Sequence, residues 1–166
     1  MTTVGHAFVL PANYPLVGAG VSAVLLLNFI NVVRHRIAAK VKYPAVYASE
    51  AEAATDPKKM QFNCAQRAHQ NTLESVPFVL AATAYLGLFH PKAATAGALS
   101  WVFGRIFYTD ERQSNQANAQ INYSTGKAEK RNAGPAVLGS ISMLGLIGGV
   151  VYTSVVECRK LYAAGL

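Results

Sequence analysis

The sequence is poor in charge and in cysteine, and each shortage excludes a class of protein. Only 14% of its 166 residues are charged and 52% are hydrophobic, whereas about a quarter of an ordinary soluble domain is charged. A disordered chain would need the opposite balance, and a soluble globule of this composition would expose a largely apolar surface. Two cysteines exclude a disulfide scaffold and a multi-cysteine zinc module. The length predicts one domain over residues 1–166.

Several catalytic and metal-binding motifs are missing as well. The chain has no serine nucleophile elbow and no phosphate-binding glycine loop. Its four histidines show no metal-ligand spacing, so we expect no metal site. The net charge of +7 would ordinarily suggest nucleic acid, but basic patches with interleaved stacking aromatics are absent. We therefore expect no nucleic-acid partner.

The charged residues that do occur are separated by long charge-free stretches, at residues 1–33, 75–91, 93–104 and 132–156. A helix needs about 20 mostly apolar residues to cross the hydrocarbon core of a bilayer. The stretches therefore predict four membrane-spanning helices, at about residues 14–33, 72–90, 93–108 and 135–156. The third is short and reaches full length only if Arg105 is included. The alternative, a soluble four-helix bundle, would need charged helix faces that these segments lack.

The basic residues are distributed unevenly among the segments that connect these spans. The segment after the first span contains Arg34, Arg36, Lys40, Lys42, Lys58 and Lys59, and the segment after the third contains Arg112, Lys127, Lys130 and Arg131. The opposite side has only Lys92, Arg159 and Lys160. Because loops rich in Lys and Arg stay in the cytosol, we expect loops one and three there, with both termini across the membrane.

Three polar side chains in FNCAQRAHQNTLE, residues 62–74, share one face if this segment is helical. Arg67, Asn71 and Glu74 are spaced i, i+4 and i+7, which places them within about 60° of one another around the helix. Such a face could bind a small zwitterion, its carboxylate on the guanidinium and its ammonium on Glu74. The spacing fits equally well an Arg–Glu network that caps the start of the helix. Spacing alone leaves both interpretations open.

Two further groups of ionisable residues lie near the ends of the expected spans. Arg105 and Tyr108 share a face at the end of the third span, where Arg105 either has a functional role or extends to the lipid headgroups. The motif YSTGKAEKR, residues 123–131, places Lys127, Lys130 and Arg131 just before the fourth span. These cations either flank that span in the cytosol, which the sequence favours, or stabilise an anion at its cytosolic end.

Together these motifs resemble the MAPEG superfamily, the membrane-associated proteins of eicosanoid and glutathione metabolism. The resemblance rests on FNCAQRAHQNTLE with the Pro77 that follows, HPKAA, FGRIFY, YSTGKAEKR and LGSISMLGLIG. It runs from about residue 11 to the end of the fourth span, and QRAHQNTLE, residues 66–74, is its most specific part. Within the superfamily, the chain most resembles the microsomal glutathione S-transferases of the third type.

The resemblance implies an all-α transmembrane four-helix bundle that forms a homotrimer and binds glutathione in a cytosol-facing groove between subunits. It further implies transfer of glutathione to a lipophilic electrophile or reduction of a lipid hydroperoxide, in an endoplasmic reticulum or mitochondrial membrane. The arginine that stabilises the thiolate in the family falls on Arg131, with Lys130 as the alternative. The glutathione-binding positions fall on Arg36, Arg67, His69, Asn71, Glu74, Arg105, Tyr108 and Tyr123.

The chain departs from the family pattern at three places. A polar, Asn- and Gln-rich insertion at about 109–122 separates two segments of the expected site. Ser75 stands where some relatives have an aromatic ligand, and Ile37 stands where leukotriene synthases have a second arginine. These changes weaken a leukotriene-synthase assignment. Two hypotheses remain: a glutathione transferase with peroxidase activity that uses Arg131, or a non-catalytic subunit of a larger membrane complex that a partner joins through the insertion.

Overall fold

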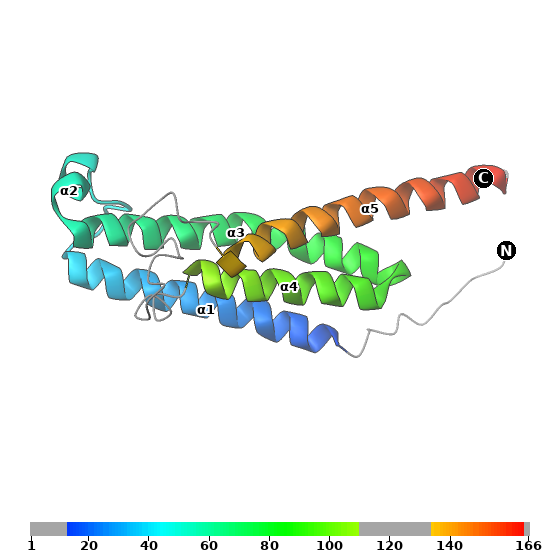
Figure 1. Cartoon of the computed structure of the whole chain (residues 1–166), viewed down its shortest axis with the longest axis horizontal. Helices are drawn as coiled ribbons and strands as arrows, with labels where there is room; N and C mark the ends of the chain where they lie inside the picture. The colour runs from blue at the N-terminus through cyan, green and yellow to red at the C-terminus, as the bar shows by residue number, and fades with distance from the viewer. Residues whose placement is uncertain (1–12, 110–133, 165–166) are drawn as a thin grey trace.

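The computed structural model describes residues 13–109 and 134–164 (Figure 1). Its elements are α1 (Tyr14–Ala39), α2 (Glu50–Thr55), α3 (Pro57–Phe89), α4 (Pro91–Thr109), the 3-10 helix η4 (Gly134–Ala136) and α5 (Val137–Ala163). The described residues contain no strand, which confirms the expected all-α fold. The four long helices form a bundle in which α4 contacts α1, α3 and α5.

The long helices extend further than the expected spans. α1 continues past residue 33 to Ala39, and α3 begins at Pro57 rather than near residue 72. Apolar runs mark only the part of a helix suited to lipid, whereas capping groups determine where a helix begins. Here the Asp56 side chain accepts a hydrogen bond from the Lys58 backbone N–H at 2.9 Å, and Pro57 occupies the first turn. The Arg67–Glu74 face therefore lies inside a helix, not at its start.

Three helical segments are long and apolar enough to cross a membrane, namely α1, α3 and the segment Gly134–Ala163 that contains α5. Among the described residues, α4, which covers the third expected span, does not reach this level. It contains Lys92 and Arg105 together with several Gly, Ser and Thr residues, which lower its mean hydropathy. Because three other helices pack against α4, less of its surface has to match the lipid.

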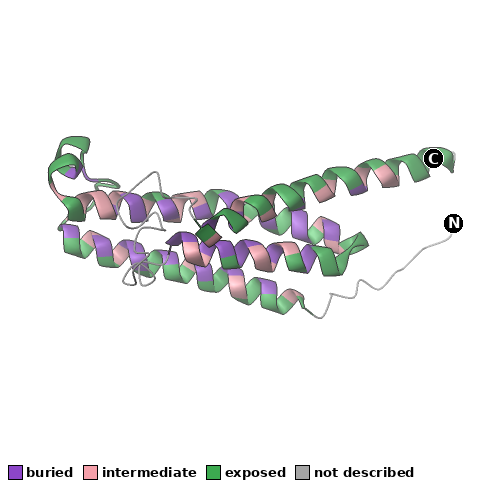
Figure 2. Ribbon diagram, in the orientation of Figure 1, coloured by how far each residue is buried: buried purple, intermediate pink, exposed green. Residues whose placement is uncertain are grey.

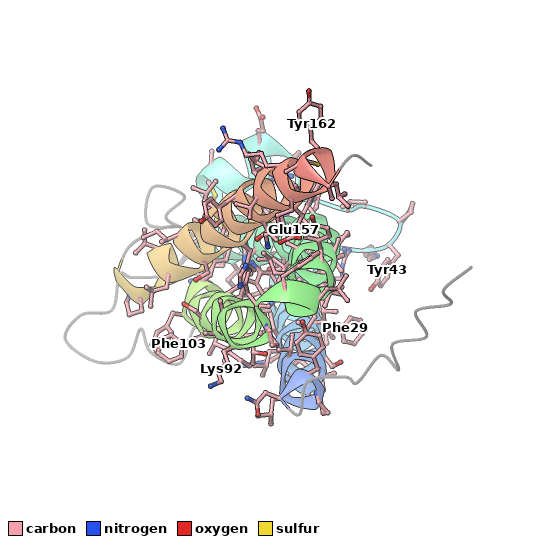
Figure 3. The ribbon with its side chains drawn as sticks, turned by 90° about the vertical axis from the view of Figure 1, so that its right-hand side faces the viewer. Phe29, Tyr43, Lys92, Phe103, Glu157 and Tyr162 are labelled. Atoms are coloured by element: carbon pink, nitrogen blue, oxygen red, sulfur yellow. The ribbon has the colours of Figure 1, made fainter. Side chains whose placement is uncertain are left out.

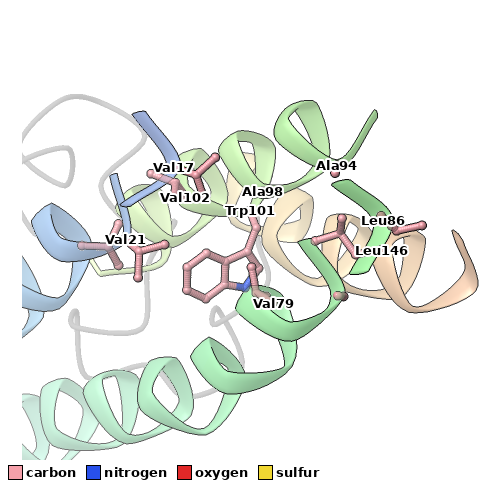
Figure 4. Close-up of a cluster of buried hydrophobic side chains, with 11 residues drawn as sticks. Val17, Val21, Val79, Leu86, Ala94, Ala98, Trp101, Val102 and Leu146 are labelled. Carbon is pink, nitrogen blue, oxygen red and sulfur yellow. The ribbon is translucent and has the colours of Figure 1, made fainter. Parts of the chain in front are cut away.

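The bundle is packed around Trp101 of α4, whose side chain is fully buried (Figure 4). All four long helices contribute to this cluster, which consists of Val17, Val21, Val24, Val79, Ala82, Leu86, Ala94, Ala98, Trp101, Val102 and Leu146. Inside a bilayer, close van der Waals packing rather than exclusion of water holds such helices together. The cluster therefore determines how α4 is rotated, and with it which side chains α4 presents to α3.

Two glycines allow α4 and α5 to approach each other closely. A Cβ added at Gly104 would lie 2.1 Å from the backbone nitrogen of Gly139, so no larger residue fits there. The GxxxG pair Gly145 and Gly149 does not make such an approach. A Cβ at Gly145 would have nothing within 4 Å, and one at Gly149 would lie 3.1 Å from a methyl of Leu86. The contact between Gly104 and Gly139 brings the start of α5 beside the C-terminal half of α4.

Many large apolar side chains are exposed, while many polar side chains are buried, as lipid surroundings favour. Exposed residues follow most of the length of α5, whose C-terminal end runs beyond the other helices (Figures 1 and 2). The side chains of Phe29 and Phe103 also point away from the bundle (Figure 3). The buried polar residues are Asn28, Asn31, His35, Thr72, Ser75, Thr83, Thr95, Arg105, Thr109 and Thr153.

Candidate functional site

A cleft of about 320 Å³ lies where α3, α4 and α5 meet. Its lining residues are Asn71, Glu74, Ser75 and Phe78 of α3, Arg105 and Tyr108 of α4, and Ser140 and Met143 of α5. Charged and hydrogen-bonding groups share the cleft with two large apolar side chains, Phe78 and Met143. Ligand sites are commonly clefts that combine apolar walls with a few polar groups.

Helical spacing explains why these residues meet. The α3 residues recur at i, i+3, i+4 and i+7 from Asn71 and so form one stripe along the helix. Arg105 and Tyr108 are likewise three residues apart on α4. Because Trp101 is buried in the core one turn earlier, α4 is rotated so that Arg105 and Tyr108 reach the α3 stripe.

Arg105 is the buried cation of the cleft, with only 8% of its surface exposed. Its Nη2 donates a hydrogen bond to Ser75 Oγ at 3.0 Å, and Ser75 Oγ donates to the Asn71 carbonyl at 2.6 Å. The guanidinium also lies over the rings of Trp101 and Tyr108, with its central carbon 5.5 and 4.9 Å from the ring centroids. These contacts hold the charge in place without neutralising it.

The environment of Arg105 favours binding of an anion. Within residues 13–109 and 134–164, no carboxylate forms an ion pair with it. Its Nε is buried and has no hydrogen-bond partner in the same part of the chain. An ionised group held in apolar surroundings without an opposite charge is costly, and cations inside membrane segments commonly mark functional sites. The Arg105 side chain also forms part of the lining of the cleft, so a ligand carboxylate bound there would lie near an unneutralised cation.

Asn71 and Tyr108 connect the two helices across the cleft. Asn71 Nδ2 donates a hydrogen bond to the Tyr108 hydroxyl oxygen at 2.9 Å. Tyr108 is 4% exposed, so this contact holds its ring and hydroxyl in a defined position. The structure therefore brings together Asn71, Arg105 and Tyr108, three of the residues expected to bind glutathione.

Arg67 and Glu74 form an ion pair along α3, with Arg67 Nη1 3.6 Å from Glu74 Oε1. Their side chains are 45% and 56% exposed, so the pair contributes no more than about 1 kcal/mol to stability. Glu74 lines the cleft, whereas Arg67 is not among its lining residues. The face predicted from the spacing thus exists. It contains both the intrahelical pair and, in Asn71 and Glu74, two cleft residues.

Two other expected site residues lie apart from the cleft. Arg36 Nη1 donates to the Ala45 carbonyl at 2.7 Å, and the guanidinium lies over the rings of Tyr43 and Phe62 at 4.4 and 4.6 Å. Arg36 therefore connects the segment between α1 and α2 with Phe62 of α3. His69 is partly buried and does not line the cleft. Tyr123, Lys130, Arg131 and nearly all of the 109–122 insertion lie outside the described residues.

The cleft also contains residues that the sequence analysis did not place in the site. In the sequence Ser75 stands out only as a departure from relatives, yet its hydroxyl accepts a hydrogen bond from Arg105. Ser75 lies at i+4 and Phe78 at i+7 from Asn71, so helical spacing alone predicts that Ser75 and Phe78 share the face of Asn71. Ser140 and Met143 come from α5, and no local motif predicts them, because only the packing of α5 against α4 places them there.

The fold and the cleft define an all-α membrane bundle with a buried cation in a half-polar cleft. The sequence model of the MAPEG family matches residues 14–111, more than half of the chain. No solved structure matches the chain. The chain therefore belongs to the MAPEG family, whose members are membrane-integral proteins of eicosanoid and glutathione metabolism.

Proposed function

We propose that the protein binds glutathione in the α3–α4–α5 cleft and acts as a membrane glutathione transferase or lipid-hydroperoxide peroxidase. The observation that carries this proposal is buried Arg105, which has no carboxylate partner in the described part of the chain and faces a cleft that also contains Glu74. Glutathione has two carboxylates and one ammonium group. It therefore needs a cation and an acid in one site, and the cleft offers both.

Different residues of the cleft can bind different groups of glutathione. Arg105 can bind a carboxylate, to which its guanidinium would donate hydrogen bonds. Glu74 can accept the ammonium group, for which it would release Arg67, and the freed Arg67 could pair with a second carboxylate. Phe78 and Met143 provide apolar surface for a lipophilic second substrate entering from the bilayer.

The chemistry of such a reaction comes from the thiol of bound glutathione, which as a thiolate attacks an electrophilic carbon or a peroxide oxygen. A thiol of this kind has a pKa near 8.5, and lowering it by about two units requires about 2.7 kcal/mol of preferential thiolate stabilisation. We assign this stabilisation to Arg131, with Lys130 as the alternative. The other partners of the proposal are a second lipophilic substrate, membrane lipid and two further copies of the chain in a homotrimer.

The test uses the full chain in detergent or nanodiscs. We expect millimolar glutathione to raise the midpoint of thermal unfolding, because a ligand that binds only the folded state stabilises it. Thiolate absorbance in the ultraviolet and turnover of a model electrophile should fall in Arg131→Ala, and Lys130→Ala tests the alternative assignment. Wild-type absorbance and turnover in Arg131→Ala would refute the role assigned to Arg131.

A second candidate function is a non-catalytic subunit of a larger membrane complex. The observation that favours it is the polar insertion at 109–122, which begins at the end of α4 beside the cleft. A wild-type protein that shows no glutathione-dependent thermal shift, but loses a co-purifying partner when residues 110–122 are deleted, would support this function over the enzyme.

A further inference from the structure

The C-terminal turn of α4 carries two cleft residues, Arg105 and Tyr108, and ends at Thr109. The last carbonyls of a helix have no hydrogen-bond partner within it. Here α1 supplies partners for Thr109. Asn31 Nδ2 donates to the Thr109 carbonyl at 3.2 Å, and Thr109 Oγ1 donates to Asn28 Oδ1 at 3.1 Å.

These hydrogen bonds lie in the interior of the bundle. Asn28, Asn31 and Thr109 are 1%, 8% and 4% exposed. Asn28 Nδ2 also donates to the Val24 carbonyl at 2.9 Å, which orients its amide so that Oδ1 faces Thr109. Because Asn28 and Asn31 are three residues apart, one face of α1 presents both amides. Without water to replace them, broken hydrogen bonds at this site would be costly.

The same turn is held on its other side by α3. Tyr108 accepts from Asn71, and Arg105 donates to Ser75. We propose that Asn28, Asn31 and Thr109 are positioning residues, which hold the last turn of α4 against α1 and thereby set the direction of Arg105 and Tyr108 in the cleft. The consequence for glutathione affinity rests on the function proposed above. The consequence for the position of Arg105 does not.

Trp101 provides a readout that needs no ligand. It is the single tryptophan of the chain, and the central carbon of the Arg105 guanidinium lies 5.5 Å from its ring centroid. We expect Thr109→Val, which keeps the shape but removes the hydroxyl, to change the Trp101 emission of the full chain in nanodiscs. Thr109→Ser should restore it. In an Arg105→Met background the change should vanish, because emission then no longer reports the guanidinium.

The matched control is Thr83→Val. Thr83 is also buried, but its hydroxyl donates to the Val79 carbonyl of its own helix, so its loss costs a similar hydrogen bond without removing one to α4. We expect glutathione Kd to rise about threefold to tenfold in Thr109→Val, as loss of one ordinary hydrogen bond implies, and to stay unchanged in Thr83→Val. A merely structural role of Thr109 would lower the unfolding midpoint without changing either Kd or Trp101 emission.

The outcomes separate this inference from the proposed function. If wild type does not bind glutathione, the proposed function fails, and the Trp101 comparison still decides whether the α1 amides position Arg105. If wild type binds but Thr109→Val matches it in both emission and Kd, the inference is overturned. If Thr109→Val does not fold, Asn31→Ala replaces it. This variant removes the other hydrogen bond to Thr109, and wild-type emission and Kd in it would overturn the inference equally.

Discussion

Replacing Arg105 with methionine should have opposite effects on stability and on ligand binding. Arg105 is 8% exposed and pairs with no carboxylate in residues 13–109 and 134–164, so its charge is held inside the bundle at a cost. Methionine has a similar length and carries no charge. Replacement of a whole buried ion pair by apolar residues of similar volume is often neutral or stabilising by about 1–4 kcal/mol, and a buried cation without a carboxylate partner lacks even the attraction that offsets part of the desolvation cost.

The substitution leaves few hydrogen-bonding groups without a partner. Ser75 Oγ, which accepts from Arg105, also donates to the Asn71 carbonyl at 2.6 Å and lies 3.2 Å from that of Thr72. Its hydrogen therefore keeps an acceptor after the guanidinium is gone. We expect the unfolding midpoint of ligand-free Arg105→Met to equal or exceed that of wild type.

Glutathione binding should weaken strongly in the same variant. A hydrogen bond to a charged group contributes about 1.5–3 kcal/mol, which corresponds to about a 10- to 150-fold rise in Kd. At a glutathione concentration 100 times the wild-type Kd, the ligand stabilises wild type by about 2.7 kcal/mol, and a variant with 100-fold weaker binding by only about 0.4 kcal/mol.

The assay is thermal unfolding of the full chain in one detergent, with and without glutathione. Lys92→Met is the matched control, because Lys92 is an exposed cation at the other end of α4. It should leave the glutathione-dependent shift unchanged. The reasoning is refuted if Arg105→Met lowers ligand-free stability while keeping the full glutathione-dependent shift, because Arg105 would then be a structural residue and not an anion site.

Two further predictions concern parts of the fold outside the cleft. Gly104→Ala should lower the unfolding midpoint, with a cost of about 1–3 kcal/mol, because its Cβ would meet the Gly139 backbone, whereas Gly145→Ala, with open space around it, should be neutral or slightly stabilising. Calorimetry of both variants checks this, and equal midpoints would contradict the close α4–α5 approach. The second concerns Glu52 of α2, where the hydrogen bond from Lys59 lowers the carboxyl pKa from 4.5 to about 2. Because the folded pKa is depressed, this contribution to stability is complete above pH 4.5 and is lost as the pH falls toward 2. The protection of α2 amides against hydrogen exchange, relative to their intrinsic rate at each pH, should therefore fall over that range, and unchanged protection would contradict the assignment.

Much of this fold was predictable from the sequence, because the features that identify it are local. Charge-free stretches predicted the long helices, and i, i+4, i+7 spacing predicted the face of α3 that carries Asn71 and Glu74. The helix ends were predicted less well, because capping groups such as Asp56 act outside the apolar runs. The third expected span corresponds to α4, and α4 is only moderately apolar because neighbouring helices cover much of its surface.

The partners of the buried polar residues could not be predicted, and the reason is geometric. Asn28 and Asn31 interrupt an otherwise apolar run, so the sequence already indicates that each needs a partner away from lipid. Their partner, Thr109, is 78 or more positions away, and only the rotation imposed on α4 by Trp101 brings it to α1. The same rotation directs Arg105 toward Ser75 instead of toward lipid headgroups, the alternative that the sequence left open. Trp101, a core residue that does not line the cleft, therefore determines through its packing which way Arg105 faces.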